Sequence, residues 1–181
     1  MKVIAFDRSA RKPLSSSCNV DIMPDSAIIK DNKPFFIPTL SDDWKYFIAP
    51  AFRIARLGKN IASRFAHRYI DGVTTAIITR PEGTSLSGLI NIFEGAIIIG
   101  EWCSPEVLTS ASTITSGDFS LHVGNAFDEA CELLARTSAV GTIKIGDILV
   151  PSRDLLDENI PLDSSLTAKL DDKTILSFRI K

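Results

Sequence analysis

The sequence predicts a mixed α+β domain that is dominated by β-structure and has a few short helices. Many short apolar segments, rich in β-branched and aromatic residues, are separated by turn residues, whereas only two segments carry the spacing of an amphipathic helix. No linker, repeat or low-complexity segment divides the 181 residues, and a chain of this length usually forms one domain. We therefore expect residues 1–181 to form a single strand-rich domain.

The first forty residues are predicted to hold one strand and two shorter apolar segments between polar connections. Residues 2–6 are an apolar run that indicates an opening strand, and residues 7–19 are a loop rich in Arg, Lys and Ser. Residues 27–29 and 35–37 are two further apolar runs. Residues 30–34, between them, have the composition of a turn, because Asp and Asn tolerate unusual backbone angles and Pro fixes one of them.

Three further strands are predicted in the middle of the chain. Residues 46–54 are mainly apolar, although Pro50 would place this strand at a sheet edge or a bulge, because proline donates no hydrogen bond to a neighbouring strand. Residues 71–72 indicate a turn, and the β-branched residues 73–79 that follow indicate a strand. A loop rich in Gly and Ser then leads to the third strand, residues 96–99.

Two helices are predicted. The first spans residues 60–69, where Asn60 is a suitable N-cap and Ile61, Phe65 and Tyr69 recur every four positions. The second follows Asn125 and has acidic residues in its first turn, which favour the positive end of a helix dipole. Its apolar stripe has the i, i+3, i+4, i+7 spacing of a buried helix face. The stripe consists of Phe127, Ala130, Cys131 and Leu134.

The C-terminal segment carries the clearest hairpin pattern. Apolar residues alternate with polar ones from Leu166 to Leu170, and again from Leu176 to Ile180. The three residues 171–173, Asp-Asp-Lys, are typical of a turn between two strands. We therefore expect two antiparallel strands, each with one buried face.

Composition excludes several classes of protein. Twenty Lys and Arg residues against 22 Asp and Glu residues leave a net charge of −2, with no basic block of the kind that nucleic-acid-binding proteins carry. No apolar run approaches the roughly 20 residues of a membrane span, and residues 1–6 lack the pattern of a signal peptide. The three cysteines are widely spaced and form no C-x-x-C pair, which argues against a zinc finger and favours a reducing, cytoplasmic setting.

The motifs of the common enzyme classes are absent: there is no nucleophile elbow, P-loop, dinucleotide glycine motif or zincin motif. Neither His67 nor His122 has an adjacent carboxylate that would orient a catalytic base. We expect His67 to lie near a helix C-terminus and His122 to be a half-exposed strand residue. Cys103 is better explained as a small buried hydrophobe than as a reactive thiol, and Asp42 and Asp43 as solvated loop residues than as a cation site.

Several stretches of the sequence resemble the fumarylacetoacetate hydrolase family. Residues 24–35 are similar to an early segment of that family, and residues 56–69 to a strand exit and the helix after it. Residues 127–129 resemble the start of its late helix, while residues 144–148 and 176–181 resemble its C-terminal part. The match covers most of the chain in order. It implies a mixed β-roll of the family's C-terminal-domain type, in which small helices pack on the sheets, usually as a homodimer.

Members of that family bind Mg²⁺ or Mn²⁺ through a Glu-x-Glu pair and a later Asp. The ion polarises a β-keto acid or a related oxo-acid for C–C hydrolysis, decarboxylation or tautomerisation. Aligned through Arg53 and residues 56–58, the Glu-x-Glu pair falls on Phe47 and Ala49, and the Asp falls on about Ile78. None of these three side chains carries an oxygen. The resemblance therefore implies that the metal ligands have been lost.

The family's other catalytic positions differ as well. Its early loop carries a His and a Glu, and residues 8–13 hold neither. Its active-site Lys falls on Asn91, with Glu94 in the place of an Asp, and its late Thr-Gly-Thr-Pro turn is replaced by residues 150–153, Val-Pro-Ser-Arg. We interpret the old site as a vestigial pocket, since apolar groups avoid the cost of burying charges that no ion compensates. The pocket comprises Phe47, Ala49, Ile78, Asn91 and Glu94.

The function predicted from the sequence is that of a catalytically inactive fumarylacetoacetate-hydrolase-like protein, a pseudoenzyme. Its scaffold would serve self-association as a homodimer, or association with an active paralogue. We expect no cofactor, where the family would use Mg²⁺ or Mn²⁺, and no nucleic-acid or membrane partner. We also expect a cytoplasmic location.

Two alternatives remain open. In the first, a divergent hydrolase, decarboxylase or tautomerase acts on a small oxo-acid at a relocated site. That site would be formed from Glu82, Glu94, Glu101 and His122. In the second, a metal-free binder holds a small carboxylate through bidentate contacts from an arginine. The arginines considered are Arg53, Arg56 and Arg80.

Overall fold

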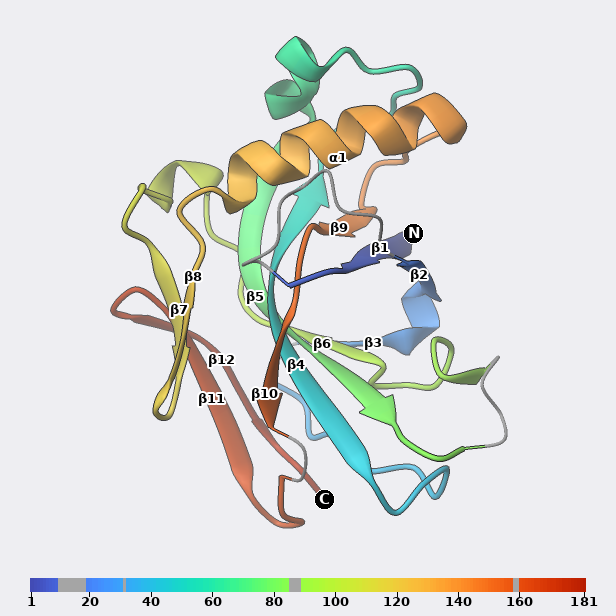
Figure 1. Cartoon of the computed structure of the whole chain (residues 1–181), viewed down its shortest axis with the longest axis vertical. Helices are drawn as coiled ribbons and strands as arrows, with labels where there is room; N and C mark the ends of the chain where they lie inside the picture. Colours follow the sequence, from blue (N-terminus) through green and yellow to red (C-terminus); the bar gives the residue numbers. More distant parts are fainter. Residues whose placement is uncertain (10–18, 31, 85–88, 158–159) are drawn as a thin grey trace.

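The computed structural model describes residues 1–9, 19–30, 32–84, 89–157 and 160–181 of the chain (Figure 1). These residues form two sheets and one α-helix. The larger sheet contains β1 (Lys2–Asp7), β2 (Asn19–Pro24), β3 (Ile28–Ile29), β4 (Trp44–Ile54), β5 (Ile70–Pro81), β6 (Ile97–Ile99), β9 (Ile148–Val150) and β10 (Asp154–Asp157). The smaller sheet contains β7 (Thr113–Ser116), β8 (Phe119–His122), β11 (Ser165–Leu170) and β12 (Lys173–Arg179). This strand-dominated α+β architecture confirms the predicted fold class.

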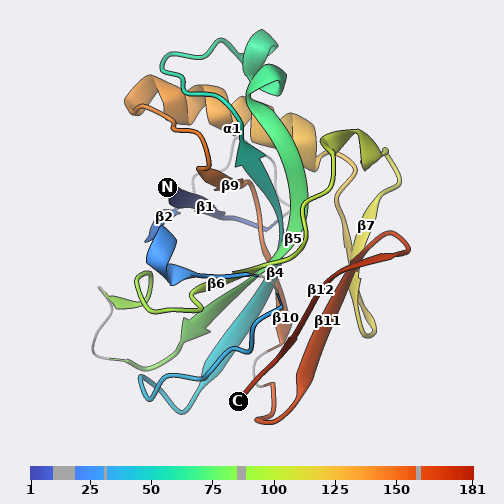
Figure 2. The ribbon, with the colours of Figure 1, turned by 180° about the vertical axis from the view of Figure 1, so that it is seen from behind.

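The larger sheet is curled into a roll. Its strand order is β2-β1-β9-β4-β5-β6-β3, with β10 on β4, so β2 and β3 form its two edges. The same two strands are joined by only the short 3₁₀ segment η1 (Asp25–Ala27), which is seen from behind in Figure 2. A connection of this length spans at most about 14 Å. The two edges must therefore approach each other, which closes the sheet around its concave face.

The inner face of the roll carries its own small hydrophobic core. Six of its thirteen fully buried members are alanines, and the others are mainly β-branched. Short side chains suit a tightly curved interior, because larger ones would clash across the roll. The thirteen residues are Val3, Ala5, Met23, Ala27, Ala49, Ala51, Ala76, Ile78, Ala96, Ile97, Ile99, Ile148 and Val150.

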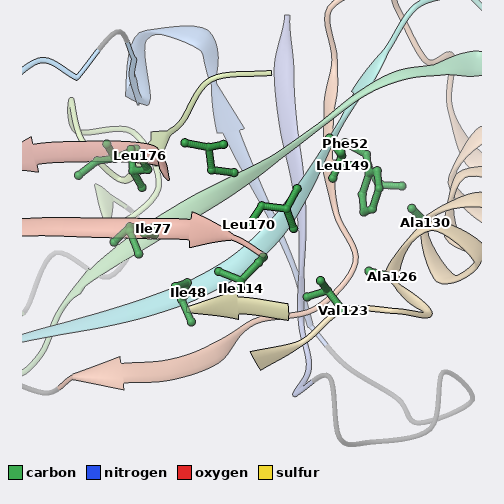
Figure 3. Packing of buried hydrophobic residues seen from close by; sticks show 14 of the residues in the cluster. Ile48, Phe52, Ile77, Ile114, Val123, Ala126, Ala130, Leu149, Leu170 and Leu176 are labelled. Atoms are coloured by element: carbon green, nitrogen blue, oxygen red, sulfur yellow. The ribbon is translucent and has the colours of Figure 1, made fainter. Parts of the chain in front are cut away.

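The outer face of the roll packs against the smaller sheet and the helix α1 (Ala126–Val140), where the main core lies (Figure 3). Ile48 and Phe52 of β4 and Ile77 of β5 point into this core, opposite Ile114 and Leu176 of the smaller sheet. The odd-numbered neighbours on β4 face the inner core instead. Both faces of β4 are thus buried, and this explains why residues 46–54 read as a nearly continuous apolar run.

The sequence predicted that Pro50 would place its strand at a sheet edge or a bulge. It does not lie at an edge, because β4 is a central strand. It pairs with β5 along its whole length, including the pair of Pro50 and Thr75. On its other side β4 has two different partners: β10 reaches Ile48, and β9 begins at Phe52. Pro50 lies between these two partners, where the ladder on that side is interrupted and a missing donor is tolerated.

The helix predicted over residues 60–69 was wrong in type and start. The chain forms a 3₁₀ helix, η2 (Ser63–Tyr69), whose N-cap position is Ala62, and Asn60 has a positive φ of 53°. The backbone N–H groups of Asn60 and Ile61 donate to the carbonyl and hydroxyl oxygens of Ser138 on α1. This docking holds the segment before Ser63 out of a helical conformation.

The turn predicted at residues 71–72 was also wrong, because both residues lie within β5. The ladder with β4 skips one residue there, since Arg53 pairs with Gly72 but Ile54 pairs with Ile70. A bulge therefore accounts for the Asp-Gly pair.

The C-terminal hairpin is confirmed as β11 and β12. The second predicted helix is confirmed as α1, although the side chain of Asn125 makes no capping hydrogen bond. None of the helices in the described ranges is long and apolar enough to cross a membrane.

The small size of the inner-core residues gives a test of the roll. Replacing fully buried Ala51 with Leu should destabilise the protein by about 1–3 kcal/mol, because the added carbons have no space between facing strands. Urea unfolding followed by circular dichroism measures the loss. The matched change Ala111→Leu, at an exposed turn, should alter stability by less than about 0.5 kcal/mol. Equal effects of the two substitutions would contradict the closed interior.

Candidate functional site

The three positions predicted to have carried metal ligands lie together on the inner face of the roll. Phe47 and Ile78 are direct partners across β4 and β5, and Ala49 pairs with Ala76. Ala49, Ala76 and Ile78 have no solvent exposure. Because Ala76 is apolar as well, an alignment of β5 that is shifted by two residues would still bring no carboxylate to this face.

A guanidinium group lies against this apolar face. Arg153, in the turn between β9 and β10, is placed over the ring of Phe47, with its Cζ 4.9 Å from the ring centroid. Only 7% of Arg153 is exposed. Its Nη2 lies 2.9 Å from Asp7 Oδ1 at the end of β1, and its Nη1 donates to Asp21 Oδ2 on β2 at 3.0 Å. The turn between β9 and β10 thus supplies a buried cation.

Asp21 is the common acceptor of this region. Arg80 Nη2, from the end of β5, donates to Asp21 Oδ2 at 2.7 Å, and Asn91 Nδ2 donates to Asp21 Oδ1 at 3.3 Å. Arg80, which is 6% exposed, also donates through Nη1 to the carbonyl oxygens of Thr79 and Ile90. We call Asp7, Asp21, Arg80, Asn91 and Arg153 the Asp21 cluster.

The electrostatics of the Asp21 cluster favour the charged form of the Asp21 carboxyl. Burial acts to raise the pKa of Asp21, but the charges and hydrogen bonds of Arg80, together with Arg153, outweigh it and lower the pKa below its ordinary value of 3.8. Burial, followed by the like charge of Arg153, lowers the pKa of Arg80, and Asp21 opposes this. Two guanidinium groups around one carboxylate, with Asp7 beside them, form a charge-balanced set.

A second ion pair connects the cluster to the helix. Arg8 Nη1 lies 3.0 Å from Glu129 Oε2 on α1 and also donates to the carbonyl oxygen of Pro151. The backbone N–H of Arg153 donates to the carbonyl oxygen of Arg8 at 2.8 Å. Burial raises the pKa of Glu129, and the charge of Arg8 opposes this. The end of β1, the turn after β9 and α1 are therefore held together at this end of the roll.

Four of the five positions predicted to form a vestigial pocket lie at this end of the roll. Phe47, Ala49 and Ile78 lie on its inner face, and Asn91 is hydrogen-bonded to Asp21. Glu94 lies elsewhere and lines a separate cavity of ≈ 260 Å³ with Lys33 and Phe36. Residues 8 and 9 of the early loop are described, whereas residues 10–13 lie outside the described part of the chain.

The acidic residues and the histidine of the relocated-site alternative do not gather in the structure. Glu82 pairs with Lys45 at the end of β5, whereas His122 ends β8 in the smaller sheet. Glu101 is exposed beyond β6. Across the described ranges, no three His, Cys, Asp or Glu side chains lie close enough together to hold a metal ion.

The three arginines of the anion-binding alternative are also separated. Arg53 pairs across the ladder with Gly72, and Arg80 with Lys45, at opposite ends of the β4–β5 hairpin. Eight residues of β5 separate these ends, which is about 26 Å of extended chain. Arg56 is exposed in the loop after β4. An anion site on the β4–β5 pair can therefore use Arg53 or Arg80, but not both.

The residues present do not fit the Mg²⁺ or Mn²⁺ of the family. A divalent cation seeks several anionic oxygens, and the face at Phe47, Ala49 and Ile78 offers none. The nearby Asp21 carboxylate is already bound by two guanidinium groups, whose positive charge would repel the ion.

Asp21, the centre of the cluster, was not among the residues predicted from the sequence. A usable signal existed, because Asp21 shares a strand face with fully buried Met23, and an acidic residue on a buried face requires a partner. The partners themselves, Arg80 and Arg153, lie 59 and 132 residues away in the sequence. Their meeting depends on the strand order, which short-range patterns do not contain.

Comparison with known proteins identifies relatives by fold only. No family model matches the chain, and no curated protein matches it either. A 5-carboxymethyl-2-hydroxymuconate delta-isomerase from Mycobacterium smegmatis superposes with a TM-score of 0.81 at 17% identity, over 99% of this chain and 78% of the isomerase. A Yersinia pestis CO92 protein assigned to the fumarylacetoacetate hydrolase family gives 0.78 at 17% identity, over 99% and 92%.

A third solved structure of similar fold contains a metal ion. The fumarylpyruvate hydrolase from Pseudomonas aeruginosa, in complex with Mn²⁺ and pyruvate, gives a TM-score of 0.74 at 12% identity, over 99% of this chain and 89% of the hydrolase. The chain thus has the fold of these isomerases and hydrolases, which confirms the predicted β-roll type. At such identities the likeness establishes the fold alone.

The lowered pKa of Asp21 predicts a specific pH dependence. A carboxyl whose pKa is lower in the folded state stabilises the protein above the unfolded value, and this stabilisation is lost as the pH falls through the folded value. At pH 7, Asp21→Asn should therefore cost about 1.5–3 kcal/mol. The difference from the natural protein should shrink below about pH 4.

Urea unfolding at several pH values between 7 and 3 measures this difference. Asp25→Asn, which changes an exposed carboxyl in the adjacent η1, is the matched control and should leave stability nearly unchanged. A cost of Asp21→Asn that stays constant down to pH 3 would show that the carboxylate charge does not hold the two arginines.

Proposed function

We propose that this chain is a fumarylacetoacetate-hydrolase-like protein that has lost the family's metal-dependent catalysis, a pseudoenzyme whose scaffold serves association. One observation carries the proposal: the positions of the family's metal ligands, Phe47, Ala49 and Ile78, form an apolar face covered by the guanidinium group of Arg153. The fold it shares with solved isomerases and hydrolases supports the comparison of positions. In this proposal, the region that binds a metal cation in the family holds the guanidinium cation of Arg153 instead.

The energetics of burial support this proposal. Three carboxylates without their ion would be costly to bury, whereas Phe, Ala and Ile pack in the interior without that cost. Arg153 in turn covers Phe47 and is neutralised by Asp7 and Asp21. The replacement therefore needs no metal to compensate buried charge, and it leaves no oxygen ligands at Phe47, Ala49 and Ile78.

Self-association as a homodimer is the partner that we propose first. Three strongly exposed apolar residues lie on neighbouring segments: Leu57 at 66%, Val140 at 91% and Ile145 at 67% exposure. These segments are joined by hydrogen bonds between Gly58 and Ile143, so the three residues belong to one region beside the end of α1. Exposed apolar groups that gather in this way favour a protein interface. We name Leu57, Val140 and Ile145 the α1-end patch.

An active paralogue of the same fold is the second partner that we propose, because it would present the same region to an inactive copy.

We also propose that the protein works in the reducing setting of the cytoplasm. Cys103 and Cys131 are free thiols, and burial raises the pKa of Cys131 to about 11, which keeps that thiol in its unreactive form.

A divergent enzyme that acts on a small oxo-acid at another site is the second candidate function. The names of the solved structures of this fold, which include isomerases and a hydrolase in complex with Mn²⁺ and pyruvate, favour it. Against it stands the separation of Glu82, Glu94, Glu101 and His122. This candidate requires a ligand-dependent effect that involves one of these side chains.

Thermal unfolding with millimolar Mg²⁺ or Mn²⁺, with and without pyruvate or oxalate, tests the loss of the metal site. A ligand at about 100 times its Kd stabilises a protein by about 2.7 kcal/mol, which corresponds to a shift of about 5–10 °C for a chain of this size. We expect no shift of this kind, because Phe47, Ala49 and Ile78 offer no oxygen ligands and the Asp21 carboxylate is already bound by two arginines. The Pseudomonas aeruginosa fumarylpyruvate hydrolase, whose structure contains Mn²⁺ and pyruvate, is the positive control.

A metal-dependent shift in this chain would contradict the proposal. The variant Glu94→Gln then separates the two candidates, because Glu94 lies away from the Asp21 cluster. Loss of the shift in this variant would place the metal at Glu94 and favour the divergent enzyme. Persistence of the shift would direct the search to the other carboxylates.

The homodimer is tested at the α1-end patch. We expect the natural protein to sediment as a dimer at micromolar concentration, and the double substitution Val140→Lys with Ile145→Lys to yield monomers, because four charges would face each other across a two-fold interface. The control is Val20→Lys with Ile22→Lys, two exposed apolar residues on β2. A monomeric natural protein, or a control that dissociates equally, would rule out this interface.

A further inference from the structure

Two adjoining cavities lie at the end of the roll opposite to the Asp21 cluster. Their volumes are ≈ 590 and ≈ 610 Å³, which is large enough for a small organic molecule. Four residues line both cavities and therefore mark the place where they meet. These residues are Lys30, Arg53, Ile99 and Trp102.

The place where the cavities meet has an apolar floor and an aromatic side. Ile99 and Ile148 are buried to 4% and 2% exposure at the base of the larger sheet. The indole of Trp102 lies close to the backbone of β5, because a Cβ on Gly72 would come within 3.0 Å of its Cε3. A side chain at this position would push the indole away from the strand by a few tenths of an ångström. A flat ring can therefore be held between Trp102 and the isoleucines.

The polar groups at the same place are cationic. The Arg53 guanidinium lies 5.2 Å from the ring centroid of Trp102, and its Nε donates to Asp71 Oδ1 at 2.8 Å. Within the described ranges, neither of its Nη groups makes a hydrogen bond or an ion pair, and the same holds for Lys30 Nζ. Of the four shared residues, two are cationic and none is acidic. Asp25 and Glu101 each line only one of the two cavities.

We propose that this place, which we call the Trp102 site, binds a small aromatic monocarboxylate. The ring would lie on Ile99 and Ile148 beside Trp102, and the carboxylate would accept hydrogen bonds from the two Nη groups of Arg53, with Lys30 adding charge. The Nε–Asp71 pair fixes the orientation of the guanidinium, so that little side-chain freedom is lost on binding. The proposal is independent of the pseudoenzyme function, since no residue of the Asp21 cluster takes part.

Titration with 1-naphthoate, followed at the indole N–H resonances in ¹H–¹⁵N spectra, tests the Trp102 site. The chain contains two tryptophans, so Trp102→Phe assigns the two signals. We expect a saturable shift of the Trp102 signal and no shift of that of Trp44, which is buried elsewhere. The neutral analogue 1-naphthalenemethanol should bind at least about tenfold more weakly, because it lacks the charge that Arg53 and Lys30 attract.

Two variants and one control complete the experiment. Arg53→Gln should weaken naphthoate binding about tenfold, and Lys30→Gln by a smaller factor, whereas Arg56→Gln should leave it unchanged. Arg56 is an exposed arginine of the same segment that lines neither cavity. An unchanged Trp44 signal in each variant verifies that the fold is intact. Equal weakening by Arg53→Gln and Arg56→Gln, equal binding of the neutral analogue, or the lack of a saturable shift would overturn the proposal.

Discussion

The long antiparallel pair of β4 and β5 is the constraint on which the rest of the structure depends. Eleven residues of β4 are paired with β5, and both faces of β4 are covered, by the inner core of the roll and by the main core. A strand that is buried on both sides can carry polar chemistry only at its ends, because a charge in the middle would have neither water nor a partner. Charged groups are accordingly found at the two ends of this pair, with only uncharged side chains between them.

The two ends of the pair differ in how their charges are used. At one end, Asp7 and Asp21 together neutralise Arg80 and Arg153, and the cluster joins β2, β5 and the turn after β9. Its charges are balanced, which suits a structural role, although Arg153 Nε and Asn91 Oδ1 are buried without a hydrogen-bond partner among the described residues. At the other end, Arg53 uses only Nε for Asp71 and lies beside an open cavity with Trp102. Unoccupied donors beside an apolar surface suit a ligand, which is the physical basis of the proposed Trp102 site.

The sequence predicted those elements whose pattern is set by near neighbours. The alternation of Leu166 to Ile180 is imposed by one buried face, and the C-terminal hairpin is therefore as predicted. The predicted helix over residues 60–69 was wrong, because hydrogen bonds from Asn60 and Ile61 to Ser138, nearly eighty residues away, override the local preference. The sheet edge predicted from Pro50 was wrong for a similar reason. A proline is tolerated in this central strand because it lies in the gap between the two partner strands β10 and β9, and strand order is not visible in a local pattern. The Asp21 cluster was missed on the same ground.

The apolar face at Phe47, Ala49 and Ile78 and the position of Arg153 are physically coupled. If Phe47 alone were changed to Glu, the new carboxylate would face the Arg153 guanidinium, which lies 4.9 Å from the ring centroid of Phe47, and would form an ion pair with it instead of coordinating a metal. If Arg153 alone were removed, Asp21 would keep Arg80, and Phe47, Ala49 and Ile78 would still offer no oxygen. Neither single change therefore creates a cation site. The apolar face and the Asp21 cluster form one self-consistent arrangement, because a change in either one alone leaves the other in place.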